Sequence, residues 1–262
     1  TGALTAPAIF VTNSRQGRSV GLGATAGDLT LSGAELQNVT GSLTLGGTPE
    51  GFVPAGAITV DGLTAAQSAN LTGLTLRAHA PGGTVTFATT PSTLSPPARV
   101  EAADGITVTT SLTATGPLTL AADVFQTGTG IIAGAGVIGA TGSITLSGQS
   151  IGLPTTPLVL GAVGGELSGT LTGAATTDVF NVRTSIPSTI NLGVITATGH
   201  DVTIDSNGGS ILHSGGGTDI TGGKVNLLAT TIGTFGNDVS VATSSPPVLC
   251  NSLPCSDNPA FF

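Results

Sequence analysis

Two cysteines, Cys250 and Cys255, carry the most distinctive chemistry in this chain. They stand in the stretch CNSLPC, two residues after a Ser-Ser-Pro-Pro break at 244–247. Two cysteines in a chain of extracellular character predict one disulfide bond and an oxidising compartment. Four residues separate them, so the closed loop would be small and would shape the tail, for example by closing the last coil, more than it would stabilise the fold. A metal site is disfavoured, because no His or second Cys pair lies nearby.

A second stretch, GHDVTID at 199–205, combines groups that serve in acid–base catalysis. It contains His200, Asp201 and Asp205, and the spacing of the two carboxylates would direct both to one face of a strand. Glycoside hydrolysis uses two convergent carboxylates, and polysaccharide lyases use Arg or Lys beside acidic calcium ligands. No basic residue stands near this stretch, so we interpret it as a solvated turn and rim. We predict no catalytic residue and no enzymatic activity.

The stretch SGGGTDIT at 214–221 partly matches a calcium-binding nonapeptide repeat of the form Gly-Gly-x-Gly-x-Asp. Gly215, Gly217 and Asp219 fit this form, whereas Ser214 replaces the first glycine. Calcium sites of this type need tandem copies that face one another, and no second copy follows. We therefore expect glycines that permit tight turns, with no metal and no cofactor.

Two further surface features are visible in the sequence. Asn38 in NVT and Asn70 in NLT match the acceptor sequence for N-glycosylation, and whether they are modified is left open. An ice-binding face would require threonines stacked in register, coil after coil. Thr59, Thr75 and Thr86, with Thr107, recur at uneven spacings, and this unevenness disfavours such a face.

The composition indicates what kind of scaffold must position these residues. Of 262 residues, 8 are Phe, and Met, Trp and Tyr are absent; charged residues make up 8%, against about 25% in ordinary globular domains. An apolar content of 39% argues against disorder, which goes with low hydrophobicity and high net charge. The core must therefore consist of many small aliphatic side chains. A solenoid uses such a core, since each coil buries a small apolar patch against its neighbours.

The charge pattern excludes several classes of partner. The formal net charge is −8, and the six basic residues are scattered singly, at Arg15, Arg18, Arg77, Arg99, Arg183 and Lys224. No patch could neutralise several phosphates, so we predict no nucleic-acid binding. No apolar run approaches the length of a membrane span. Because patterned sequence begins at residue 1, we expect a processed product whose export signal has been removed.

Short alternating stretches of apolar and polar residues predict strands with one buried face. They include Leu43–Leu45, Ile58–Val60, Leu74–Leu76, Val85–Phe87, Ile106–Val108, Leu118–Leu120, Ile144–Leu146, Val202–Ile204 and Val225–Leu227. Gly, Asn, Asp or Ser-Gly follows nearly every run, as is typical of turns. No stretch shows a helical apolar stripe, so the fold class is all-β.

A recurrence over 81 residues distinguishes between all-β folds. Residues 143–160 and 224–241 match without a gap at their apolar positions and at an Ile-Gly pair. A β-sandwich usually has larger aromatic core residues and tight hairpins, whereas Asn-Gly occurs here once, at 207–208. Four coils of about 20 residues would account for the recurrence. We therefore predict a right-handed parallel β-helix of about 12 coils, roughly 55–60 Å long at the usual strand spacing.

The chain divides into three predicted parts. Residues 1–20 form an N-terminal cap or coupling segment, residues 21–243 the β-helical rod, and residues 244–262 a tail that contains the prolines and cysteines. Two proline-containing stretches, at 46–56 and 87–100, are predicted to be loops that leave the rod, because proline cannot donate to a β-ladder.

Four stretches resemble a known family of proteins, namely SITLSGQSIGLPTTPLVL (143–160), KVNLLATTIGTFGNDVSV (224–241), ITVTTSLTATGPLTLAA (106–122) and GELSGTLTGAATTDVFNV (165–182). They look like the unit of filamentous-haemagglutinin-like exoproteins of bacterial two-partner secretion. In that unit a Leu-Thr-Leu-type strand runs through Ile-Gly to a polar turn and a second strand. The resemblance covers most of residues 20–243, but the family's Asn-Pro-Asn-bearing N-terminal secretion domain is not found. We therefore expect a C-terminal part of a longer product, or a smaller relative exported differently.

The resemblance implies a secreted β-helical adhesin on the outer surface of a Gram-negative bacterium. Its expected partners are neighbouring subunits or repeats of the same fibre, together with surface glycans or host receptors. In anchored members of the family, a C-terminal disulfide loop stays in the periplasm and plugs the transporter pore. By this resemblance, Cys250 and Cys255 are expected to form an anchoring hook at an outer-membrane transporter.

Two alternative functions are kept open. The first is a subunit of a self-assembling extracellular filament or sheath, since an exposed coil end is an unpaired strand edge that accepts another chain. The N-terminal segment TGALTAPAIF and the tail from 244 would then be the caps or couplers. The second alternative, a polysaccharide-acting β-helix enzyme, is disfavoured because no cluster of charged residues is visible in the sequence.

Overall fold

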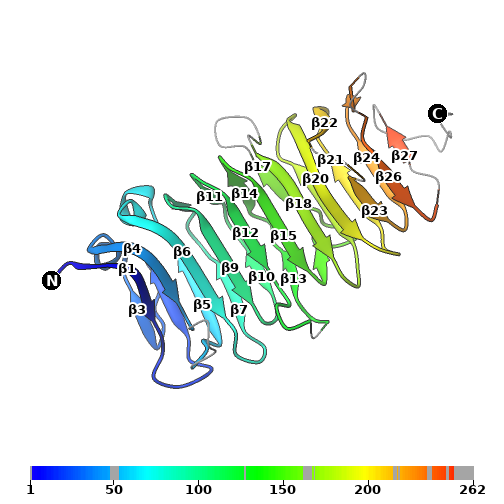
Figure 1. Cartoon of the computed structure of the whole chain (residues 1–262). Coiled ribbons are helices and arrows are strands. Elements are labelled where there is room, and N and C mark those ends of the chain that lie inside the picture. Colours follow the sequence, from blue (N-terminus) through cyan, green and yellow to red (C-terminus); the bar gives the residue numbers. More distant parts are fainter. Residues whose placement is uncertain are drawn as a thin grey trace.

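The chain folds into a β-solenoid, in which parallel strands stack from one end of the molecule to the other (Figure 1). The computed structural model describes residues 2–47, 53–126, 128–161, 167, 169–214, 217, 219–234, 238–245 and 248–250. The solenoid has about 7 turns of roughly 24 residues each. The predicted all-β fold class and the parallel β-helix are thus confirmed.

The described residues contain two parallel sheets and two short helices. The 12-stranded sheet, here sheet A, contains β1 (Leu4–Val11), β4 (Val39–Leu45), β6 (Leu71–Ala78), β9 (Ala98–Ala102), β12 (Leu118–Ala121), β15 (Ile144–Gly148), β18 (Thr170–Ala175), β20 (Thr189–Ala197), β22 (Ser210–His213), β23 (Ile220–Gly222), β25 (Thr231–Ile232) and β26 (Val241–Thr243). The 15-stranded sheet, here sheet B, contains β2 (Val20–Gly23), β3 (Leu29–Leu31), β5 (Ala57–Asp61), β7 (Thr84–Phe87), β8 (Ser92–Leu94), β10 (Ile106–Val108), β11 (Leu112–Ala114), β13 (Ile131–Ala133), β14 (Val137–Ala140), β16 (Ser150–Ile151), β17 (Leu158–Gly161), β19 (Phe180–Thr184), β21 (Val202–Asp205), β24 (Val225–Leu228) and β27 (Val248–Cys250). The helices are α1 (Gly33–Leu36) and the 3-10 helix η1 (Ala65–Ser68).

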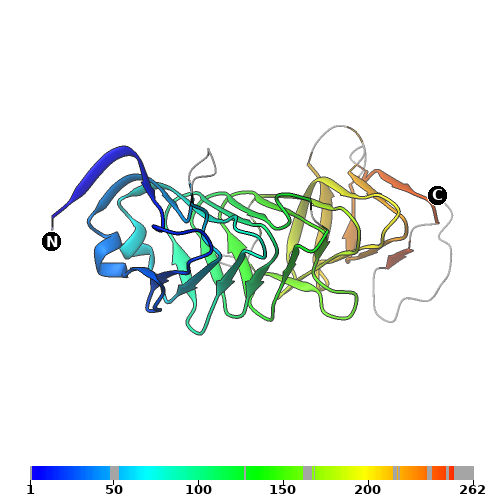
Figure 2. The ribbon, with the colours of Figure 1, turned by 90° about the horizontal axis from the view of Figure 1, so that it is seen from below.

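Each coil in the middle of the solenoid has three strands, as in the succession β9, β10, β11 and then β12, β13, β14 (Figure 2). Sheet A forms one side of the coil, and sheet B forms the other two. The two sides of sheet B meet at β19, where Phe180 is the Cα partner of Ile151 in β16 and Val182 is the partner of Leu158 in β17.

One buried column shows how the coils are stacked. Its members are fully or almost fully buried and are successive Cα partners, namely Ile58, Val85, Ile106, Ile132, Ile151, Phe180, Val202 and Val225. Seven steps separate the first residue from the last, about 34 Å at the usual strand spacing. With about 7 turns of roughly 24 residues, the predicted number of about 12 coils was wrong. The connections at the corners differ in length, and they make the average turn somewhat longer than the predicted 20 or so residues.

The 81-residue recurrence does not correspond to a whole number of turns. Ile144 lies in β15 of sheet A, whereas its sequence match Val225 lies in β24 of sheet B. Conversely, Ile151 lies in β16 of sheet B, whereas its match Ile232 lies in β25 of sheet A. All sides of the solenoid need the same inward apolar and outward polar alternation. The recurrence therefore reflects this shared alternation and not the period of the coil.

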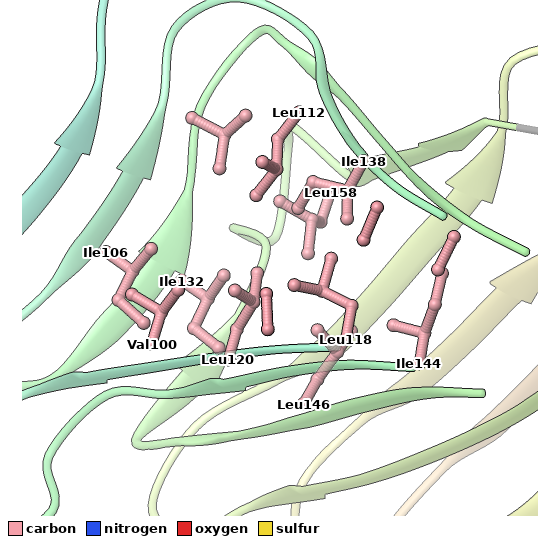
Figure 3. Packing of buried hydrophobic residues seen from close by; sticks show 14 of the residues in the cluster. Val100, Ile106, Leu112, Leu118, Leu120, Ile132, Ile138, Ile144, Leu146 and Leu158 are labelled. Atoms are coloured by element: carbon pink, nitrogen blue, oxygen red, sulfur yellow. The ribbon is translucent and has the colours of Figure 1, made fainter. Parts of the chain in front are cut away.

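The core is built from small aliphatic side chains that approach one another from all sides of the coil. Figure 3 labels ten of them, from sheet A and from both sides of sheet B, directed toward a common interior. Gly173 interrupts the inward column of sheet A between Leu146 and Ile195. The ring of Phe180 fills that space, since a Cβ atom on Gly173 would lie 2.3 Å from Cε2 of Phe180. One large side chain thus compensates for one glycine on the facing sheet.

The predicted loop excursion at 87–100 was wrong. This segment contains β8 and part of β9, and Leu94 and Val100 are fully buried. Its prolines occupy positions between the strands, where no ladder hydrogen bond is required of them. The excursion at 46–56 differs, since Ala55 N donates to Gly46 O at 2.6 Å and closes its base; residues 48–52 lie outside the described part of the chain.

Strands also occur beyond the predicted boundaries of the rod. β1 pairs with β4 and β27 pairs with β24, although residues 1–20 and 244–262 were assigned to a cap and a tail. The sheets therefore extend at least from Leu4 to Cys250.

Threonine columns cover parts of the outer surface despite their uneven spacing in the sequence. Thr59, Thr86 and Thr107 are successive Cα partners in sheet B, so the argument against stacking from sequence spacing was wrong. Thr75 lies in the other sheet, where its column continues to Arg99. The threonines are thus divided between two sides of the solenoid and do not form one flat two-column face.

Two short helices in the N-terminal part are stacked copies of one motif that the sequence analysis missed. Ser32 and Glu35 form a capping box at α1, and Thr64 and Gln67 form another at η1. Each helix is followed by Asn-x-Thr-Gly, and the Nδ2 group of Asn70 donates to Gln37 O at 2.7 Å. The side-chain amide of Asn38 donates to Ala34 O at 3.0 Å. Both sequon asparagines therefore take part in helix-end contacts.

Candidate functional site

Among the described residues, the strongest concentration of charge lies on the outer face of sheet A, across β6 and β9. Register places Arg77 of β6 beside Glu101 of β9, and the Arg77 Nε atom lies 2.9 Å from Glu101 Oε2. Arg99 Nε donates to the other carboxylate oxygen of Glu101. The ring of His79 adds a third contact, with Nε2 at 2.9 Å from Glu101 Oε2 but not aligned for a hydrogen bond.

Sequence reasoning missed this cluster. It treated the basic residues as isolated, because Arg77 and Glu101 are 24 positions apart. That separation is one turn of the solenoid, so the two residues become neighbours only once the register is known. A cluster of charged residues therefore exists on the folded surface, although none is visible in the sequence.

The carboxylate of Glu101 is held in its ionised form. Burial by itself raises the pKa of Glu101, but the contacts with His79 and Arg99 and the charge of Arg77 outweigh burial and lower the pKa to about 2. The Glu101 side chain is 7% exposed, whereas the Arg99 side chain is 54% exposed. Glu101 thus holds Arg99 at the surface and is a weak base near neutral pH.

The connection between β12 and β13 folds back beside this cluster. Val124 N donates to Ala102 O at 3.2 Å, and the carboxylate of Asp123 accepts from Gly128 N at 3.0 Å. The Phe125 ring meets the His79 ring edge to face, with centroids 5.3 Å apart at 73°. Phe125 is nevertheless 57% exposed, so this connection presents an aromatic ring to solvent beside a charged cluster.

A hollow of about 430 Å³ lies between this connection and the strands of sheet A. Its floor includes the small residues Ala121, Ser147 and Gly148, and its lining also includes His79, Arg99, Glu101, Ala122, Asp123, Val124, Phe125, Gln126 and Thr176. Ala121 is the Cα partner of both Glu101 and Ser147. Along this outward-facing column, the large side chains of Arg77 and Glu101 are followed by the small side chains of Ala121 and Ser147. The hollow lies where the side chains are small.

The cluster predicted at 199–205 has a structural role. Asp205 ends β21, and its Oδ1 accepts from Asn207 N at 2.7 Å, which stabilises the turn at Asn207 and Gly208. Both of these turn residues have positive φ, +53° and +86°. Asp201 is exposed and lies outside β21, with its backbone carbonyl accepting from Phe180 N. The observed contacts agree with the predicted turn and rim.

Asp219, the acidic residue of the partial calcium motif, is already engaged by protein groups. His213 Nδ1 lies 2.7 Å from its Oδ1, and Ser240 N donates to its Oδ2 at 2.9 Å. Gly215 lies outside the described residues. Asp219 therefore links the connection between β22 and β23 to Ser240 of the next coil.

The predicted disulfide falls at the edge of the described structure. Cys250 is the last residue of β27, where its backbone is paired with Leu228 of β24. Cys255 lies outside the described residues, so the pairing of the two cysteines stays a prediction.

A search of the described residues for metal-binding groups found no set of three or more His, Cys, Asp or Glu side chains positioned to hold an ion. Within the same part of the chain, no helix has the length and apolar content needed to cross a membrane.

Comparisons of the chain with protein-family models, with curated proteins and with solved structures found no match.

Proposed function

We propose that this chain is the β-helical rod of a secreted adhesin on the bacterial cell surface. The observation that supports this proposal is the stack of about 7 coils, which holds long outward columns of polar side chains at fixed spacing. Such a stack combines reach with a large contact surface. The resemblance of most of residues 20–243 to filamentous-haemagglutinin-like exoproteins supports the same proposal, and with it an extracellular location.

The C-terminal tail is proposed to anchor the rod. Cys250 and Cys255 would form a small disulfide loop that is retained at an outer-membrane transporter. Cys250→Ser should then release the protein into the medium, measured by immunoblotting of cell and medium fractions. Unchanged retention would refute the anchor and leave the adhesive function of the rod unaffected.

The adhesive function is tested with purified protein on fluorescent beads. We expect beads that carry the chain to be retained on an epithelial cell monolayer at least about tenfold more than beads that carry albumin, because multivalent presentation amplifies weak contacts. Retention equal to that of albumin beads would overturn the proposal. Heat-unfolded protein on the same beads is the matched control, because adhesion by a folded surface should disappear on unfolding.

A filament subunit is the second candidate. Its supporting observation is β1, whose described pairing is with β4 on one side, and which carries the exposed side chains of Leu4 and Phe10. An open strand edge of this kind accepts a further strand. Electron microscopy of the purified chain would show fibres with a repeat near one subunit length if copies add at this edge. Isolated rods at high concentration would exclude assembly by this chain alone.

Catalysis on polysaccharides is the least supported candidate. The carboxylate of Glu101 has a pKa of about 2, so it is poorly suited to donate or accept a proton near neutral pH. We expect incubation with polygalacturonate to give no new reducing ends. Sustained turnover would require the enzyme hypothesis to be adopted instead.

A further inference from the structure

The hollow on sheet A has the size and the position of a site for an extended ligand. Its volume of about 430 Å³ falls within the usual range for small-molecule sites, roughly 300–1,000 Å³. It extends from Glu101 in β9 past Ser147 in β15 to Thr176, which directly follows β18. Three strand steps correspond to about 14 Å along the axis. A chain-like molecule that lies along the rod fits this shape better than a compact one.

The exposed position of one arginine favours a ligand that carries a carboxylate. The charges of Arg77 and Arg99 are balanced by the carboxylates of Glu101 and Asp123, so the preference depends on the placement of Arg99 and not on a surplus of positive charge. The carboxylate of Asp123 lines the hollow and accepts from Gly128 N of its own connection. Arg99 is bound to Glu101 through Nε and its side chain is more than half exposed. Its terminal nitrogens are suited to the two oxygens of a ligand carboxylate.

The other side of the hollow offers groups of a different kind. Phe125 presents an exposed ring that is held edge to face by His79, and an aromatic face attracts the weakly positive C–H groups of a sugar ring. Gln126, Ser147 and Thr176 add an amide and two hydroxyl groups that both donate and accept hydrogen bonds. An aromatic ring, neutral polar groups and one arginine together match a sugar that carries a carboxylate.

We propose that this hollow binds an oligosaccharide that contains uronic acid, with a carboxylate on Arg99 and a sugar ring on Phe125. The proposal rests on the adhesive function proposed above and specifies the class of ligand. Glu101 acts here as a positioning residue, because it fixes Arg99 at the rim of the hollow without contacting the ligand.

Isothermal titration calorimetry with two matched tetrasaccharides tests this site. Tetragalacturonate should bind at least about tenfold more tightly than its methyl ester, because the ester lacks the charge that pairs with arginine. Arg99→Gln should abolish this preference, whereas Phe125→Ala should weaken the binding of both sugars. Arg183→Gln is the control, since Arg183 is exposed in β19 on another side of the rod, and it should bind like the parent.

Several outcomes would overturn the site. These are no measurable binding of tetragalacturonate, equal binding of acid and ester, or an unchanged preference in Arg99→Gln. Circular dichroism establishes that each variant is folded, and the exposed position of Phe125 makes Phe125→Ala the safer variant for the fold.

Bead adhesion distinguishes the proposed ligand site from the general proposal of an adhesin. Adhesion that persists in Arg99→Gln after loss of acid binding would place the adhesive contact elsewhere, whereas acid binding without bead adhesion would refute the adhesin and retain the site.

Discussion

At the scale of single residues, Glu101 is the most informative side chain of the surface. It is a nearly buried carboxylate on the outer face of a chain with few charges, and two arginines and a histidine surround it. Desolvation of a buried carboxylate is costly, and its partners offset that cost, so removal of one member leaves the others without compensation. The ion cluster should therefore influence stability as well as the shape of the hollow.

The pH dependence of stability should report this cluster. The folded pKa of Glu101, about 2, lies below the ordinary value of 4.5, so its contribution is complete above about pH 4.5 and is lost as the pH falls toward 2. We expect Glu101→Gln to lower the free energy of unfolding by about 2 kcal/mol near neutral pH. The difference from the parent should shrink in acid.

Urea denaturation at several pH values measures this effect. Asp201→Asn removes an exposed carboxylate and serves as the control. A constant difference between parent and Glu101→Gln down to about pH 2.5 would contradict the account of the ion cluster.

At the scale of elements, the facing columns of the core depend on each other. Gly173 of β18 and Phe180 of β19 occupy one space between the sheets. Other positions of these columns hold Leu, Ile or Val. The large ring of Phe180 in sheet B therefore fills the space that Gly173 leaves in sheet A of the same coil.

Gly173→Ala should destabilise the chain by about 1–3 kcal/mol, because its new methyl group would overlap the Phe180 ring. Phe180→Leu should recover part of this loss when both changes are present, since a smaller side chain makes room at the contact. Thermal unfolding of the two single variants and the double variant gives the coupling energy. Strictly additive effects would show that the two residues do not share the space.

The capping boxes make a second prediction at this scale. Ser32→Ala removes the acceptor for Glu35 N at the start of α1 and should cost about 1 kcal/mol in unfolding free energy. Thr64→Ala should act similarly at η1, because its side chain accepts from Gln67 N in the same way. Chemical denaturation checks both, and no change in either variant would mean that the boxes do not stabilise this end of the solenoid.

At the scale of the whole molecule, the sequence predicted the architecture better than its dimensions. The alternation of apolar and polar residues in stretches such as Ile106–Val108 is a local property, and it was sufficient to predict strands with one buried face. The parallel coils were predicted from the small aliphatic composition and from the 81-residue recurrence, although that recurrence is not the period of the coil. Coil length depends on corner insertions, which no local pattern encodes, and the stretch at 87–100 looked like a loop because its prolines stand at corners. The charged cluster was not predictable, because the coil length must be known before Arg77 and Glu101 can be recognised as neighbours in adjacent coils.

Each proposal above depends on one central claim, namely that distant segments stack one strand spacing apart into a rod whose outer surface carries the function. Spin labels on outward positions of sheet B test this claim by double electron–electron resonance. Thr107 and Thr203 are four coils apart, and Thr59 and Thr203 are six coils apart. The account predicts backbone separations of about 19 Å and about 29 Å, a ratio set by the number of coils. Similar distances for both pairs, or a shorter distance for the second pair, would contradict it.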